Sequence, residues 1–194
     1  MLRKLLALSL LLAALAGCAG AGNSGTEAAL ELRTKYIGAS EVFFKTDMIA
    51  DYGDKVYDYT LEYSGDGSTG IINVISPEEI EGITVEIKKD GLRLGYRGAM
   101  IDTGALYADG LSPVEAFPAM IDAWRTGYVI SCRGAKMYEK DCLEITFNLT
   151  EYEGAPEVSH TAWFDSATLL PVAGEIISDG RTVLTCKFTD AEVQ

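Results

Sequence analysis

The feature that most constrains the fold is a long series of short segments in which apolar and polar residues alternate. These segments fill most of the chain from residue 41 to residue 190, and turns rich in Gly, Asp, Ser and Pro separate them. Alternation with a period of two is typical of β-strands that bury one face. The regular spacing of strands and turns predicts an antiparallel meander of about ten or eleven strands. A sheet of this length has to curl, and its apolar concave face then needs a cover.

Two segments carry helical signals instead. The first is TEAALELRTKYI (residues 26–37), which Thr26 can cap and Gly38 can end. The second is LSPVEAFPAMIDAWRTG (residues 111–127), in which Ser112, Pro113 and Glu115 occupy the positions of a capping box with proline at the first helical residue. The predicted fold class is therefore α+β, with a long curled meander and two or three helices that cover its concave face.

The N-terminus, MLRKLLALSLLLAALAGCAG, has the features of a secretory signal: two basic residues, a short apolar core and a small-residue exit. The core extends from Leu5 to about Leu15, whereas a membrane-spanning helix needs roughly 20 apolar residues. The end, Leu-Ala-Gly-Cys, resembles the lipobox of bacterial lipoproteins. That resemblance implies cleavage after residue 17 and acylation of Cys18. The alternative is an ordinary signal peptide that contains a cysteine by chance.

Three regions follow from this interpretation: a lipoprotein signal peptide (residues 1–17), a lipidated flexible tether (18–25) and one folded domain (26–194). The expected location is the outer face of the bacterial cytoplasmic membrane, with the protein held there by acyl chains. Removal of residues 1–17 takes away two of the 16 basic residues and none of the 29 acidic ones, which leaves a net charge of about −15. So acidic a chain argues against binding to nucleic acid or to anionic lipid surfaces. The acidic surface is suited to binding a basic protein partner, or it is simply a surface in contact with water.

Three cysteines remain after Cys18, an odd number that cannot all pair within one chain. If residues 139–140 form a two-residue hairpin turn, Cys132 lies opposite Phe147 and points to the apolar side of its strand. Cys142 then points to the other side, so the two thiols cannot form a disulfide.

The sequence offers little chemistry for catalysis. His160 is the only histidine, it lies in an alternating strand, and no His or Cys pair has the spacing of metal ligands. We therefore expect His160 to fill part of the concave face, and we expect no metal and no cofactor. The acidic residues that a glycosidase-like pair could draw on are more simply explained as solvated loops; they are Asp51, Asp54, Asp58, Glu78, Glu79 and Glu81. We expect a protein that binds and is not an enzyme.

One segment, HTAWFDSATLLPV (residues 160–172), resembles a hairpin of the lipoprotein-carrier fold shared by LolA and the sigma-factor regulator RseB. The order of elements over residues 26–194 agrees with that fold, which implies an unclosed half-barrel whose apolar hollow is covered by helices. Within this group, the lipobox, VISPEEI (74–80) and GLSP (110–113) are most similar to the germination (GerS-like) lipoproteins of spore-forming Firmicutes. Those relatives imply a tethered, non-catalytic protein that binds a peptidoglycan amidase. LolA itself has no lipobox. A protein tethered through Cys18 could not shuttle between membranes as a free carrier does, so the lipobox favours partner binding over transport.

Three functions remain open. The first is binding of a protein partner, such as a cell-wall hydrolase, through sheet edges or the helical cover. The second is binding of a lipid, an acyl chain or a lipoprotein in the hollow, and the third is an RseB-like regulator of envelope stress. The residues expected to line such a hollow lie on the second helix and on the later strands; they are Phe117, Met120, Ile121, Trp124, Phe147, Val158 and Phe164. In a fourth interpretation, the same residues pack a closed core.

Overall fold

The computed structural model describes residues 21–66, 68–88, 91–104, 111–150 and 152–194. The signal peptide and Cys18 therefore lie outside the described residues. The described residues of the first part of the chain form one helix, six strands and a 3-10 turn: α2 (Ala21–Gly38), β1 (Val42–Asp51), β2 (Val56–Gly65), β3 (Thr69–Ser76), η1 (Glu78–Ile80), β4 (Thr84–Lys88), β5 (Gly91–Tyr96) and β6 (Ala99–Gly104). The second part forms α3 (Pro113–Thr126), β7 (Tyr128–Met137), β8 (Lys140–Asn148), β9 (Val158–Asp165), β10 (Pro171–Ser178) and β11 (Arg181–Val193).

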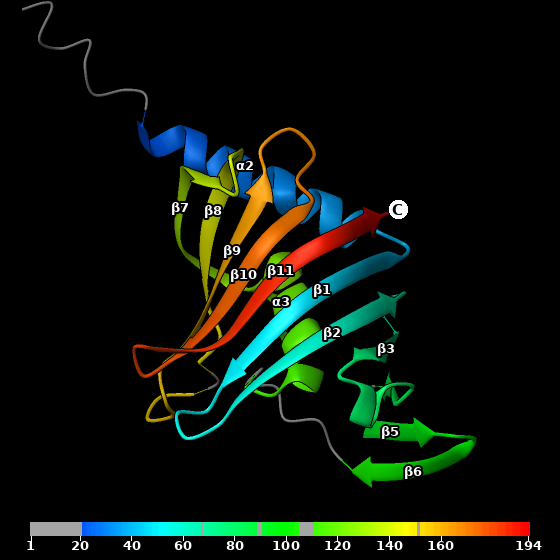
Figure 1. Cartoon of the computed structure of the whole chain (residues 1–194). Coiled ribbons are helices and arrows are strands. Elements are labelled where there is room, and N and C mark those ends of the chain that lie inside the picture. Colours follow the sequence, from blue (N-terminus) through cyan, green and yellow to red (C-terminus); the bar gives the residue numbers. More distant parts are fainter. Residues whose placement is uncertain (1–20, 67, 89–90, 105–110, 151) are drawn as a thin grey trace, which may run out of the picture.

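The described strands form a single antiparallel sheet of 11 strands in the order β6-β5-β4-β3-β2-β1-β11-β10-β9-β8-β7. Strands that are consecutive in the sequence pair with each other, except β6 and β7, and the first and last strands, β1 and β11, meet in the middle. The two ends of the sheet are therefore β6 and β7, which are the strands that flank α3 in the sequence. The sheet curls around α3 but does not close, and α2 crosses its upper end (Figure 1). This confirms the predicted fold class, an α+β unclosed half-barrel.

The alternation in sequence appears directly as alternating burial. Along β1 the buried side chains are every second residue from Val42 to Ala50, and those between them are more exposed. Because neighbouring residues of a strand point to opposite faces, one face of the sheet is apolar and continuous. This face contacts the helices, and the other face contacts solvent.

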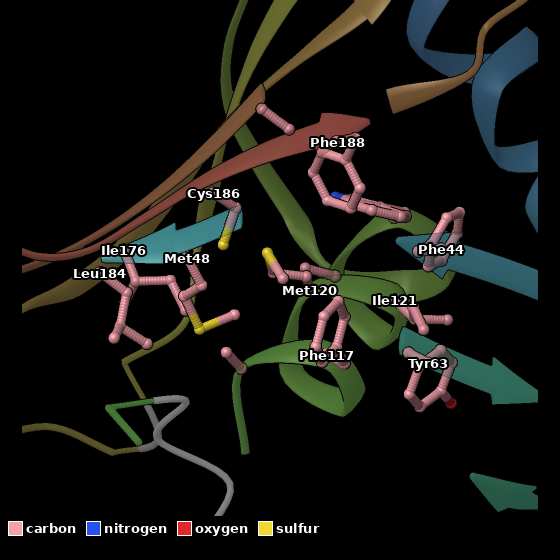
Figure 2. Close-up of a cluster of buried hydrophobic side chains, with 14 of the residues drawn as sticks. Phe44, Met48, Tyr63, Phe117, Met120, Ile121, Ile176, Leu184, Cys186 and Phe188 are labelled. Atoms are coloured by element: carbon pink, nitrogen blue, oxygen red, sulfur yellow. The ribbon is translucent and has the colours of Figure 1, made fainter. Parts of the chain in front are cut away.

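The helix α3 provides the cover for the hollow. Its cap is the one the sequence predicts: Ser112 is the N-cap, its hydroxyl oxygen accepts from the Glu115 amide at 3.3 Å, and Pro113 is the first helical residue. Phe117, Met120 and Ile121 point from α3 toward side chains of the central strands (Figure 2). The amphipathic stripe of this helix thus packs into the curled sheet.

Two local expectations were wrong. The helix α2 begins at Ala21, so residues 21–25, which were expected to belong to a flexible tether, are helical. Gly25, which would be expected to break a helix, is accommodated because it packs closely against the backbone of Cys132, and such tertiary contact overrides low helix propensity. In the hairpin of β7 and β8 the turn is Tyr138-Glu139, with φ of 48° and 63°, and Met137 pairs with Lys140.

This turn displaces the predicted register by two positions, so Cys132 lies opposite Ile145 and not Phe147. A two-residue turn with positive φ at both positions usually contains Asn or Gly, and this sequence gives no such signal. A displacement of two keeps each side chain on its face. Cys132 therefore still shares a face with Ile145, while Cys142 pairs with Ala135 on the other face, and both thiols are free.

Candidate functional site

The hollow of the half-barrel is the first candidate site, and α3 packs into it; among the described residues a cavity of about 220 Å³ remains beside Ile121. The seven predicted lining residues belong to one core cluster, and none is more than 4% exposed: Phe117, Met120, Ile121, Trp124, Phe147, Val158 and Phe164. A void large enough for water would leave exposed area on the side chains around it. Five of the seven have no exposed area at all. These residues are therefore packed together in the core, as the fourth interpretation expects.

The centre of this core is Trp124 on α3. Its indole ring lies edge-on to three neighbouring rings, with centroids 5.1 Å from Tyr36, 5.2 Å from Phe164 and 5.7 Å from Phe44. Edge-to-face contacts at such distances stabilise a core beyond simple burial. These partners come from α2, β9 and β1, so one side chain joins both helices to both halves of the sheet.

His160 lies beside this tryptophan, fully buried, as the sequence analysis expects. The indole Nε1–H of Trp124 donates to His160 Nε2 at 2.9 Å, so the proton of the neutral imidazole is on Nδ1, which lies 3.0 Å from the Glu175 carbonyl oxygen and donates to it. Burial lowers the pKa of His160 from 6.5 to about 4. Both ring nitrogens are satisfied by structural partners, and His160 is therefore a structural polar link between α3 and the sheet.

The acidic residues noted in the sequence do not converge. Asp54, Asp58, Glu78, Glu79 and Glu81 are exposed in turns and at strand ends. Asp51 is half-buried and lies 3.8 Å from Arg181. Among the described residues no group of three or more His, Cys, Asp and Glu side chains is arranged to hold a metal ion.

A second candidate site, which the sequence analysis did not single out, is the β6 end of the sheet. Met100 and Ile101 are adjacent residues of this strand, and they are 57% and 60% exposed. Since adjacent residues point to opposite faces, both faces of β6 carry a solvent-exposed apolar side chain. The β5–β6 hairpin pairs with β4 and forms this end of the sheet, at the lower right of Figure 1. The signal was present in the sequence as two consecutive apolar residues that break the alternation.

A third candidate site lies at the other end of the sheet, where β7 passes beside α2. Here Leu30, Tyr128 and Ile130 are 57%, 73% and 55% exposed. They line a groove of about 560 Å³ between the helix and the strand. Both ends of the open sheet therefore present apolar surface to solvent, although the predicted lining residues between them are buried. No helix in the described part of the chain is long and apolar enough to cross a membrane.

Comparison with known proteins gives the fold a context. No protein-family model matches the sequence, and no curated protein matches it. Solved structures do match. A domain described as an outer membrane lipoprotein-sorting protein, from Vibrio parahaemolyticus, is 12% identical with a TM-score of 0.50, covering 88% of this chain and 92% of that one. An uncharacterised conserved protein from Thermus thermophilus is 7% identical with a TM-score of 0.52, covering 87% of each chain.

A chain in the complex of the CwlD amidase with the GerS lipoprotein, from Clostridioides difficile, is also similar. It is 14% identical and covers 91% of this chain and 99% of that one, but its TM-score of 0.40 is too low to carry an argument. The expected resemblance to the LolA-like fold is confirmed. At these identities the likeness establishes the fold, and function has to be argued from the surfaces described above.

Proposed function

We propose that this chain is a non-catalytic lipoprotein, anchored through Cys18 to the outer face of the bacterial cytoplasmic membrane, whose domain binds a protein partner. The basic residues, short apolar core and lipobox-like end of the N-terminus support the anchor. His160 has both ring nitrogens engaged in the core, and this supports a function without catalysis.

The observation that supports the proposal is the burial of the predicted lining residues. A carrier of lipid or lipoprotein needs an apolar cavity, and such cavities measure about 300–1,000 Å³. In this protein Phe117, Trp124 and Phe147 occupy the corresponding space with no exposed area. Opening the hollow would mean moving α3 off the sheet and exposing the whole aromatic core. Binding at the outer surface requires no such rearrangement.

The β6 end of the sheet is the surface that we assign to the protein partner. A terminal strand has backbone N–H and C=O groups on its outer side that can pair with a strand of another chain. Here β6 is such a strand, and Met100 and Ile101 add apolar contacts on both of its faces. Soluble proteins usually protect an edge of this kind with charge or cover. Its exposure supports a partner that covers it.

The class of partner follows from the resemblance to germination lipoproteins, which points to a peptidoglycan amidase. The segment VISPEEI that carries part of that resemblance contains the end of β3 and the turn η1. The net charge of about −15 after signal removal favours a partner whose contact surface is basic, because complementary charge accelerates encounter.

The test is a binding measurement between the purified lipoprotein and the peptidoglycan amidase of the same organism. The variant Ile101→Asp places a charge on the proposed contact. The matched control is Val56→Asp, because Val56 is 57% exposed at the start of β2, four strands away from β6. We expect Ile101→Asp to weaken binding about tenfold or more, as for a central contact residue, and the control to bind normally. Equal effects of the two variants, or no binding by the unaltered protein, would contradict the proposal.

A further inference from the structure

The groove between α2 and β7 is a separate site from the β6 edge. It is lined by the middle of α2 and the first half of β7: Gly25, Thr26, Ala29, Leu30 and Arg33 from α2, and Tyr128, Val129, Ile130, Ser131 and Cys132 from β7. None of the seven core residues lines it. Its volume of about 560 Å³ is typical of small-molecule sites, which measure about 300–1,000 Å³.

A paired β-strand is a poor occupant for this groove. A Cβ atom added to Gly25 would lie 3.0 Å from the carbonyl oxygen of Cys132, so α2 packs tightly against the strand at that point. Ile130 is the extra residue of a β-bulge, because Val129 pairs with Phe147 and Ser131 pairs with Thr146. A covering helix and a bulge both prevent strand addition. The occupant is therefore a molecule that does not need backbone pairing.

The groove combines an apolar strip with a cation at one end. Leu30, Tyr128 and Ile130 are more than half exposed along its rim, and Ala29 is buried beneath them. From Gly25 to Arg33 the helix rises eight residues, or about 12 Å. At the Arg33 end the strip meets the carbonyl of Gly127, where α3 ends and β7 begins.

Arg33 has hydrogen-bonding capacity that the described residues leave unused. Its Nη2 donates to the Gly127 carbonyl oxygen. Its Nε is buried and has no hydrogen-bond partner, and Arg33 forms no ion pair with the other described residues. A buried donor on a charged group is costly to leave unpaired. Arg33 as a whole is only half-buried and lines the groove, so a ligand there meets the rest of its guanidinium. An anionic oxygen is the partner that a guanidinium binds best, since charge-assisted hydrogen bonds are the strong ones.

We propose that this groove binds a single acyl chain that ends in a carboxylate, a fatty acid. The carboxylate lies at Arg33, and the chain lies along the apolar strip toward Gly25 and Cys132. The inference stands apart from the proposed function, because it requires neither the amidase nor the acylation of Cys18.

Cys132 provides a reporter for the test, because it is half-buried in the groove wall while Cys142 and Cys186 are buried. The full chain carrying Cys18→Ser is treated with a maleimide, with and without dodecanoate below its micelle concentration. Dodecanoate at ten times its dissociation constant should slow the labelling of Cys132 about tenfold, because about one groove in eleven is then empty. Dodecan-1-ol, which has no carboxylate, should protect far less.

Three variants complete the design. Arg33→Gln and Leu30→Asp should each abolish the protection by dodecanoate. The matched control is Ile37→Asp, since Ile37 is 63% exposed on the same helix and does not line the groove; it should keep full protection. Leu30→Asp changes an exposed residue and should fold even if Arg33→Gln does not. Equal protection by acid and alcohol, retained protection in Leu30→Asp, or protection only by a two-chain phospholipid would overturn the proposal.

Discussion

Acid should destabilise this protein through one buried residue, the only histidine in the sequence. In the unfolded chain the imidazole of His160 takes up a proton near pH 6.5, whereas in the folded protein its pKa is lowered to about 4 by burial. Between these two values the unfolded state binds more protons than the folded state, so stability falls as the pH falls. The stability associated with the neutral, buried imidazole is complete above pH 6.5 and is lost on acidification.

The magnitude follows from the pKa difference. One pKa unit corresponds to about 1.4 kcal/mol, so the free energy of unfolding should fall by about 2 kcal/mol between pH 7 and pH 5, and by about 3 kcal/mol by pH 4. The carboxylates whose pKa values are lowered by hydrogen bonds, Asp66 (about 2) and Asp165, lose their contributions mainly below this window. The loss between pH 6.5 and pH 4 is therefore assigned to His160.

The assay is urea denaturation followed by circular dichroism at pH 7, 6, 5 and 4, for the unaltered protein and for His160→Gln. The glutamine variant will be less stable at pH 7, because it cannot reproduce both hydrogen bonds, but it has no titrating group at this position. Its stability should therefore change little across the window. If the variant loses as much stability between pH 7 and pH 4 as the unaltered protein, the reasoning is refuted.

Three further changes test the packing of the hollow. Phe147→Ala should lower the free energy of unfolding by about 3–5 kcal/mol, measured by urea denaturation, whereas Ile49→Ala, at a side chain 45% exposed, should cost far less. Trp124→Phe should cost at least about 1–3 kcal/mol, because it leaves Nε2 of His160 buried without a donor; a smaller loss would argue against that hydrogen bond. Ser112→Ala should remove the cap of α3 and cost about 1 kcal/mol, seen as a lower melting temperature, and an unchanged melting temperature would contradict the capping role.

Periodicity and capping signals were sufficient to predict most of the fold. The alternation from Val42 to Ala50 is the burial pattern of β1 itself, and the cap at Ser112 is where the sequence puts it. The sequence did not predict the turn at Tyr138-Glu139, because residues with positive φ there lack the usual Asn or Gly. It also missed the start of α2, because the helix before Gly25 depends on contact with a strand more than a hundred residues away.

For the candidate sites too, the sequence predicts some features and only the fold shows the others. The apolar stripe of α3 predicted correctly which residues face the sheet, but whether they line a cavity or fill it depends on how closely the two surfaces approach. That distance is set by the curvature of the whole sheet and is not visible in any local pattern. The groove at Arg33 depends on residues from α2 and β7 that meet only in the fold, so spacing along the chain gives no sign of it.

The most direct test of the central claim is site-specific photo-crosslinking in cells that make the lipidated protein. A photoreactive residue replaces Ile101 on the terminal strand β6 in one strain, and Val56 on β2 in another; the two native side chains are similarly exposed, at 60% and 57%. The account predicts a crosslink from position 101 to a peptidoglycan amidase and none from position 56. Crosslinks of equal yield from both positions, or an amidase that is absent from the products at position 101, would contradict it.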